Sequence, residues 1–268
     1  MLSMNDDLIA RAQGGDRMAM EQLLSSVAPS IKRFAHRMCR HEADAEDVLQ
    51  DTLLSIATNL GDFQGRSALP SWTFAITRSA CARRRRGKKN APAEGDARLE
   101  EHPAEEPGPG DRAEARELGS LVERALDGLP EEHREVLLLR DAEGLSGAEA
   151  AAALGISLEA LKSRLHRARA ALREALRPIL ERGDTAHSTD CPDVVRALSE
   201  KLEGDLDAKV CEQMEEHVRG CEACGRTCDV LHDALAACRA SPTSSLTPEL
   251  ESRVRRAVTR WVESRSKS

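Results

Sequence analysis

The chain has 268 residues, of which 40% are hydrophobic and 32% charged, a composition typical of globular proteins with two or three small domains. Only 2% of the residues are aromatic and Tyr is absent, so we expect helical cores built from Leu, Val, Ile, Ala and Met. No apolar run is long enough to cross a bilayer, and the N-terminus has no signal-like start, so we expect a cytoplasmic protein without a membrane partner. The net charge of -7 disfavours nucleic acid for the whole chain, but local basic patches decide phosphate binding.

Residues 5–86 are predicted to form a helical domain. Asp16 is placed to cap its long first helix, and Pro29 to bend it. The apolar stripe of that helix consists of Met20, Leu23, Leu24, Val27, Ile31, Phe34 and Met38. A second helix is expected from about Asp44 to Asn59, with an inward face of Ala45, Val48, Leu49, Thr52 and Ile56. A third begins near Pro70, with an expected inner face of Trp72, Ala75, Ile76 and Ser79.

The rest of the chain is predicted to be helical as well, so the expected fold class is all-α. Residues 87–112 are rich in Gly, Pro, Ala and charge, which predicts a flexible linker. Residues 113–180 form a second helical domain, residues 181–190 a short linker, and residues 191–240 a Cys-rich module. A tail helix over 247–263 would present Leu250, Val254, Val258 and Trp261 on one face.

The segment LSGAEAAAALGISLEALKSRLHRARAALR at 145–173 has the pattern of a helix-turn-helix. Ser146 and Glu149 make a capping box, Gly155 supplies the positive φ of a sharp turn, and Ser157 caps the second helix. Leu161 and Leu165 are expected inward. The outward side of this helix is predicted to contact DNA, with its N-terminal end at base edges and its basic residues at phosphates: Ser157, Glu159, Lys162, Ser163, Arg164, His166, Arg167 and Arg169. A solvated basic helix in a bundle is the alternative.

With LPEEHREVLLLR at 129–140 before it, this helix-turn-helix resembles region 4 of the extracytoplasmic-function (ECF) sigma factors of the sigma-70 family. The first domain is similar to region 2 of the same family, through DAEDVLQDTLL at 44–54 and FQGRSALPSWTFAITR at 63–78. The resemblance implies that region 4 binds the −35 promoter element and the β flap of core RNA polymerase. It implies that the first acidic helix docks on the β′ clamp through Asp44, Glu46, Asp47, Gln50 and Asp51.

In the same resemblance, a basic run follows the promoter backbone, through Arg78, Arg83, Arg84, Arg85 and Arg86. The loop at about 60–69 would hold a flipped base. Phe63 is either a wall of that base pocket or part of the core, whereas Trp72 is expected in the core.

Six of the eight Cys lie between 191 and 238, which in a cytosolic chain indicates metal ligands rather than disulfides. His217 and Cys221 lie one helical turn apart, Cys224 follows, and Cys191 can supply a fourth ligand for tetrahedral Zn(II). CPDVVRALSEKLEGDL at 191–206 and EEHVRGCEAC at 215–224 resemble the zinc-binding anti-sigma domain, fused here behind a sigma factor as in the CorE-like metal-responsive sigma factors.

Three further thiols in this module, Cys211, Cys228 and Cys238, are either small buried side chains or extra ligands for a thiophilic ion such as zinc, cadmium or copper. His232 is expected in solvent rather than at the metal. Cys39 and Cys81 in the first domain are expected in the core.

These features predict a non-enzymatic sigma factor that directs core RNA polymerase to promoters. Contact of the Cys-rich module with region 2 or 4 would control it, and metal binding would shift that contact. The CorE-like resemblance implies activation by metal and targets in metal export or detoxification. Alternatives are a thiol redox sensor with structural zinc, a polymerase-independent repressor, and a hydrolytic zinc centre, which four protein ligands disfavour.

Overall fold

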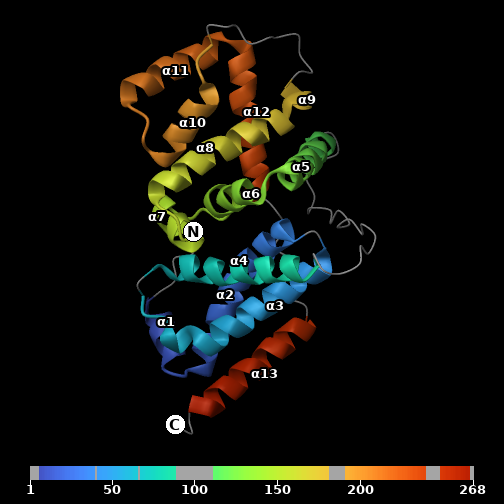
Figure 1. The fold of residues 1–268 in the computed structure, drawn as a ribbon, viewed down its shortest axis with the longest axis vertical. Helices are drawn as coiled ribbons and strands as arrows, with labels where there is room; N and C mark the ends of the chain where they lie inside the picture. The colour runs from blue at the N-terminus through green and yellow to red at the C-terminus, as the bar shows by residue number, and fades with distance from the viewer. Residues whose placement is uncertain are drawn as a thin grey trace. The chain divides into compact units, whose positions relative to one another are not determined.

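The computed structural model describes residues 6–39, 41–65, 67–88, 111–180, 191–239 and 248–265, and all regular structure in these ranges is helical (Figure 1). Most of the predicted linker 87–112 and all of 181–190 lie outside the described residues. The chain divides into two compact units. One holds residues 1–103, 152–155 and 242–268, and the other residues 104–151 and 156–241.

The first unit is built from the N-terminal helices and the last helix of the chain. Its elements are α1 (Asp6–Gln13), α2 (Arg17–Met38), α3 (Glu42–Asn59), η1 (Leu60–Asp62), α4 (Leu69–Lys88) and α13 (Pro248–Arg265). Asp16 caps α2 as predicted, since its carboxylate accepts a hydrogen bond from the Ala19 amide at 3.1 Å. The helix runs through Pro29 without interruption.

One apolar core joins α2, α3 and α13. The predicted stripe of α2 and the predicted inward face of α3 are buried, as expected from their helical spacing. The tail helix α13 lies beside α2 and α3 (Figure 1) and adds Val254, Val258 and Trp261 to this core. The side chain of Leu250 lies outside the described residues. The sequence predicts the apolar face of α13, and the structure identifies the surface that it covers.

The predicted inner face of α4 is only partly correct. Trp72 and Ile76 are half-buried and pack against the core, whereas Ala75 is half-buried and Ser79 is exposed. The buried face carries Leu69, Ser71, Thr73, Phe74, Thr77, Ala80 and Cys81. The physical reason is the aromatic contact between Phe74 and Phe34 of α2, whose ring centroids are 5.4 Å apart and which turns this side of α4 inward.

The second unit contains the remaining helices, except that residues 152–154 at the end of α7 belong to the first unit. They are α5 (Asp111–Gly128), α6 (Glu131–Leu137), the π-helical turn η2 (Leu138–Ala142), α7 (Gly147–Leu154), α8 (Leu158–Ala175), α9 (Arg177–Leu180), α10 (Val194–Glu203), α11 (Ala208–Gly220) and α12 (Glu222–Arg239). No helix among the described residues is long and apolar enough to cross a membrane.

The helix-turn-helix has the capping interactions that the sequence predicts. The Ser146 amide donates to Glu149 Oε2 at 2.8 Å, and the Glu149 amide donates to Ser146 Oγ at 3.2 Å. Gly155 adopts a φ of +66° in the turn, and Ser157 Oγ accepts a hydrogen bond from the Ala160 amide at the start of α8.

Candidate metal centre and nucleic-acid interface

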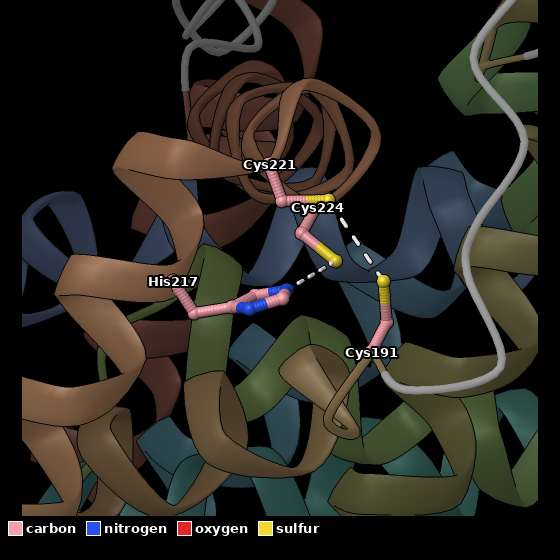
Figure 2. A group of neighbouring side chains, drawn as sticks. All are labelled: Cys191, His217, Cys221 and Cys224. Atoms are coloured by element: carbon pink, nitrogen blue, oxygen red, sulfur yellow. Dashed lines mark hydrogen bonds between the residues drawn. The ribbon is translucent and has the colours of Figure 1, made fainter.

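The Cys-rich module brings four ligand side chains together at one end of its helices. Cys221 follows the last turn of α11, where its amide donates to the carbonyl of His217 at 2.8 Å. Cys224 lies in the first turn of α12, and Cys191 precedes α10. The ligand atoms of these four residues all lie within 4.8 Å of one another, and Figure 2 shows the side chains converging on a common point.

The spacing of the four atoms fits a tetrahedral zinc shell. With Zn–S bonds of about 2.3 Å, two thiolates on one tetrahedral ion are about 3.8 Å apart. The sulfur atoms of Cys191 and Cys221 are 3.8 Å apart, and His217 Nε2 lies 3.3 Å from the sulfur of Cys224 (Figure 2). Within the described part of the chain, these four residues form a group of Cys and His side chains close enough to share one metal ion. The donor set therefore supports the predicted zinc site.

The thiols of the site differ in their electrostatic environment. Burial, together with the sulfur atoms of Cys191 and Cys221, raises the pKa of Cys224 to about 12. The Cys224 backbone amide donates to Cys221 and lowers the pKa of that thiol. A buried thiol of high pKa becomes a thiolate only when a cation replaces its proton, which is what zinc does in such sites.

The three further thiols of the module do not join this group. Cys211 donates a hydrogen bond to Glu215 Oε1 at 3.5 Å on α11, and Cys228 is half-buried on α12, where burial raises its pKa. Cys238 is buried near the end of α12. Their role as extra ligands stays a prediction. His232 is exposed, in agreement with the expectation that it lies in solvent rather than at the metal.

Most residues of α8 that we expected to contact DNA are on the surface. Glu159, Ser163 and Arg167 are exposed, and Lys162, Arg164 and His166 are half-buried. Lys162 Nζ lies 2.6 Å from Asp205 Oδ2, in the turn between α10 and α11 of the Cys-rich module. That contact raises the pKa of Lys162, mainly through its hydrogen bond with the Asp205 carboxylate.

The expectation that Arg169 points outward is wrong. Its side chain is 1% exposed and forms a two-pronged ion pair with Asp141 of η2, with Nη2–Oδ1 at 2.7 Å and Nε–Oδ2 at 3.1 Å. Arg169 Nη2 also lies 3.3 Å from Glu203 Oε1, at the end of α10. The sequence held a signal for this position, because Arg169 continues the i, i+4 row of Leu161 and Leu165.

This buried network attaches the Cys-rich module to the helix-turn-helix domain. Glu203 accepts a second hydrogen bond from Arg140 Nε at 3.1 Å, and Arg140 Nη2 donates to the carbonyl of Leu202. Arg239 of α12 donates to the carbonyl of Asp141 at 2.7 Å. No pattern in the sequence marks Glu203, Asp205 or Asp141, because the partners of these carboxylates are distant in the chain.

In the first unit, the predicted polymerase-binding face of α3 is open to solvent. Its residues are exposed or half-buried: Asp44, Glu46, Asp47, Gln50 and Asp51. Asp47 pairs with Arg84 of the basic run at 2.7 Å, so one predicted polymerase contact and one predicted DNA contact bind each other. Both side chains are partly exposed, so solvent weakens the pair.

The arginines of the basic run on α4 differ in how far they are exposed to solvent. Arg83 and Arg86 are exposed, and Arg78 is half-buried. Arg85 is half-buried and donates to the carbonyl of Met38 at 3.4 Å.

Phe63 packs against Trp72, with ring centroids 5.2 Å apart, and both lie against the core of the first unit. Gln13 fixes the start of this loop by donating to the carbonyls of Leu60 and Phe63, at 3.0 and 2.7 Å. This favours the core alternative for Phe63, while its contact with a flipped base stays a prediction.

Comparisons with known proteins agree with this arrangement. Family models described as Sigma-70 region 2 and Sigma-70, region 4 match residues 23–91 and 120–172, and a zinc-finger family model matches residues 191–225. The ECF RNA polymerase sigma factor SigM of Mycobacterium tuberculosis is 36% identical over 173 residues, which cover 64% of this chain and 84% of that protein. The chain belongs to the ECF RNA polymerase sigma factor family.

Two further relatives carry related names. The RNA polymerase sigma factor CnrH of Cupriavidus metallidurans is 34% identical over 172 residues, covering 62% of this chain and 90% of CnrH. A solved structure of CnrH in complex with the cytosolic domain of CnrY matches with 30% identity and a TM-score of 0.50, covering 64% of this chain and 96% of that one. Family membership makes core RNA polymerase and promoter DNA the partners of this ECF sigma factor and disfavours the polymerase-independent repressor.

Proposed function

We propose that this ECF sigma factor is controlled by the metal ion held in its Cys-rich module, which sets the access of α8 to promoter DNA. The observation that carries the proposal is the contact of Asp205 with Lys162, a residue expected to touch the −35 element. A carboxylate on a phosphate-binding lysine competes directly with DNA. Because surface ion pairs are individually weak, this contact is a reversible cover.

The acidic turn between α10 and α11 adds to this effect. Glu203 and Asp205 flank Gly204, whose φ of +75° ends α10 and turns the chain beside α8. Glu203 is held by Arg140 and Arg169 in the buried network, so the turn is anchored on the helix-turn-helix domain. DNA phosphates that approach α8 meet negative charge at this position.

The metal site and the acidic turn lie at opposite ends of the same helices. Cys191 precedes the start of α10, and His217 lies near the end of α11, while the turn joins the end of α10 to the start of α11. A change in ligand geometry therefore alters how α10 lies against α11 and shifts Asp205 against Lys162. A metal ion moves this equilibrium only to the extent that it binds the two arrangements with different affinity.

The distances among the four ligand atoms support tetrahedral zinc in the arrangement in which Asp205 contacts Lys162. Activation by metal, which the CorE-like resemblance implies, then requires an ion that prefers other ligands. Cys211 and Cys228, both half-buried in α11 and α12, offer further thiols to a softer ion such as cadmium or copper. The genes served would be those of metal export or detoxification.

The remaining contacts of the proposal follow the family pattern. The acidic face of α3 would dock on the β′ clamp of core polymerase, and region 4 would contact the β flap. The exposed arginines Arg83 and Arg86 would follow the promoter backbone through salt-dependent phosphate contacts.

The test is transcription from fragmented genomic DNA by core polymerase and the purified full chain, with sequencing of the transcripts. The chain is loaded with Zn(II), Cd(II) or Cu(I), or stripped of metal. Promoter-specific transcripts whose yield depends on the ion support metal control. Equal yields in every metal state would leave a sigma factor whose Cys-rich module is structural.

A structural zinc with redox-sensing thiols is the second candidate, favoured by how closely the four ligand atoms already match a zinc shell. It predicts that hydrogen peroxide releases zinc and changes transcription, while exchange of the metal ion does not.

A further inference from the structure

The first unit contains two thiols that the sigma-factor account does not use. Cys39 follows the last turn of α2, and Cys81 lies in the second half of α4. Their sulfur atoms are 3.9 Å apart, and both side chains are buried, at 5% and 0% exposure. A disulfide requires about 2.05 Å between the sulfur atoms, so about 2 Å of side-chain and local backbone movement separates the thiol pair from a cross-link.

The surroundings of Cys39 lower the pKa of its thiol. The hydrogen bond with Cys81 lowers the pKa of Cys39, and the guanidinium groups of Arg85 and Arg84 act in the same direction, while burial and Asp44 act against them. Arg85 is held beside the pair, since it donates to the carbonyl of Met38. The thiolate is the form that reacts with peroxide.

We propose that Cys39 and Cys81 are an oxidisable dithiol that hydrogen peroxide converts into a disulfide between α2 and α4. The Cys39 thiolate attacks one peroxide oxygen, breaks the O–O bond and becomes a sulfenic acid, while the departing hydroxide takes a proton to form water. The Cys81 sulfur then displaces the sulfenic hydroxyl, which leaves as a second water. The two thiols lose two electrons in total, and one peroxide is reduced to two waters.

This pair is chemically separate from the zinc site. The metal ligands lie in the second unit, and a bound ion holds their thiolates, so peroxide must compete with zinc there. The simpler interpretation of Cys39 and Cys81 is two small side chains that fill the core. That interpretation explains their burial, whereas the dithiol interpretation also gives a role to the 3.9 Å approach of the two sulfur atoms and predicts a cross-link.

The cross-link would fix the end of α2 to α4 immediately before the basic run. Arg83 and Arg86 follow Cys81 on the same helix, and Arg84 bridges to Asp47 of α3. Oxidation would therefore restrict the part of the first unit that carries both predicted promoter and predicted polymerase contacts.

The experiment uses the full chain loaded with zinc. It is exposed to hydrogen peroxide at increasing doses, quenched in acid, alkylated under denaturing conditions and analysed by peptide mass spectrometry. We expect the Cys39–Cys81 cross-linked peptide to appear at doses that leave zinc bound. In Cys81→Ala, Cys39 has no resolving thiol, so we expect a sulfenic acid that dimedone traps. Cys238→Ala, which removes a buried thiol of the second unit, is the matched control and should keep the cross-link.

Other outcomes overturn the proposal. If peroxide releases zinc while Cys39 and Cys81 both stay reduced, the pair is only part of the core. A Cys39 that reaches the sulfinic acid in the unaltered chain, with no cross-link, would show that Cys81 does not resolve it. Should Cys81→Ala fold poorly, Cys39→Ala serves instead, and it should lose both the cross-link and the dimedone adduct.

Discussion

Replacing Arg169 with Ala tests whether the buried ion network holds the second unit together. Arg169 is 1% exposed and contacts two carboxylates, those of Asp141 and Glu203, whose side chains are themselves 4% and 6% exposed. Removing one partner of a buried pair leaves an uncompensated charge, at a cost of about 3–5 kcal/mol. With a urea m-value of about 2 kcal/mol/M, the unfolding midpoint of this unit should fall by roughly 1.5–2.5 M.

The two Trp residues allow this effect to be assigned to one unit. Trp72 and Trp261 are the two Trp of the chain, and both belong to the first unit. Circular dichroism follows helices of both units, whereas Trp fluorescence follows the first. For Arg169→Ala with zinc present, we expect the circular dichroism transition to gain an early phase while the fluorescence transition stays in place.

Arg167→Ala is the matched control, since Arg167 lies on the same helix, is exposed and donates to the backbone of Ser163. Its effect should be within about 0.5 kcal/mol, as for surface positions generally. The reasoning is refuted if both variants unfold alike. A joint replacement of Arg169 and Asp141 by apolar residues should recover much of the loss, because Glu203 keeps its ion pair with Arg140 and no buried charge is left without a partner.

Three further predictions concern the tail helix and the metal site. Trp261→Ala should destabilise the first unit by about 3–5 kcal/mol, because Trp261 is part of its core, whereas Arg260→Ala on the exposed side of α13 should change the fluorescence midpoint little. Cys224→Ser should abolish zinc binding measured by metal analysis after dialysis, and Cys238→Ser should keep it; zinc retained by Cys224→Ser would contradict the four-ligand site. Zinc binding should release protons into a weakly buffered solution and weaken as pH falls, because the pKa of Cys224 is about 12 without metal and its thiol must lose its proton; pH-independent affinity would count against thiolate ligation.

Much of the local structure could be predicted from the sequence, because its causes lie within a few residues. The capping box of Ser146 and Glu149, the positive φ of Gly155 and the cap at Ser157 follow from residue type and spacing. The spacing of His217, Cys221 and Cys224 also predicts that these side chains face one another, and the structure brings them together with Cys191. Metal binding by these four side chains stays a prediction.

What the sequence did not predict depends on contacts between distant segments. The inward face of α4 is set by Phe34 of α2, and the burial of Arg169 by Asp141 and Glu203. The basic neighbours of Arg169 predict a DNA contact for it, although its position in the row of Leu161 and Leu165 points inward. Cys39 and Cys81 are also far apart in the chain and meet only through the packing of α2 on α4.

The covering of Lys162 by Asp205 is the central claim, and amine footprinting measures it without knowledge of the promoter. The full chain in each metal state is treated briefly with an amine-acylating reagent, and modification of each lysine is measured by mass spectrometry. Exposed Lys209 on α11 is the internal reference, and Asp205→Asn is compared with Asp233→Asn, which makes the same charge change on an exposed part of α12. We expect Lys162 reactivity to rise in Asp205→Asn and in the metal state that activates transcription, while Lys209 stays constant. Lys162 reactivity that is the same in every metal state and in both variants would contradict it.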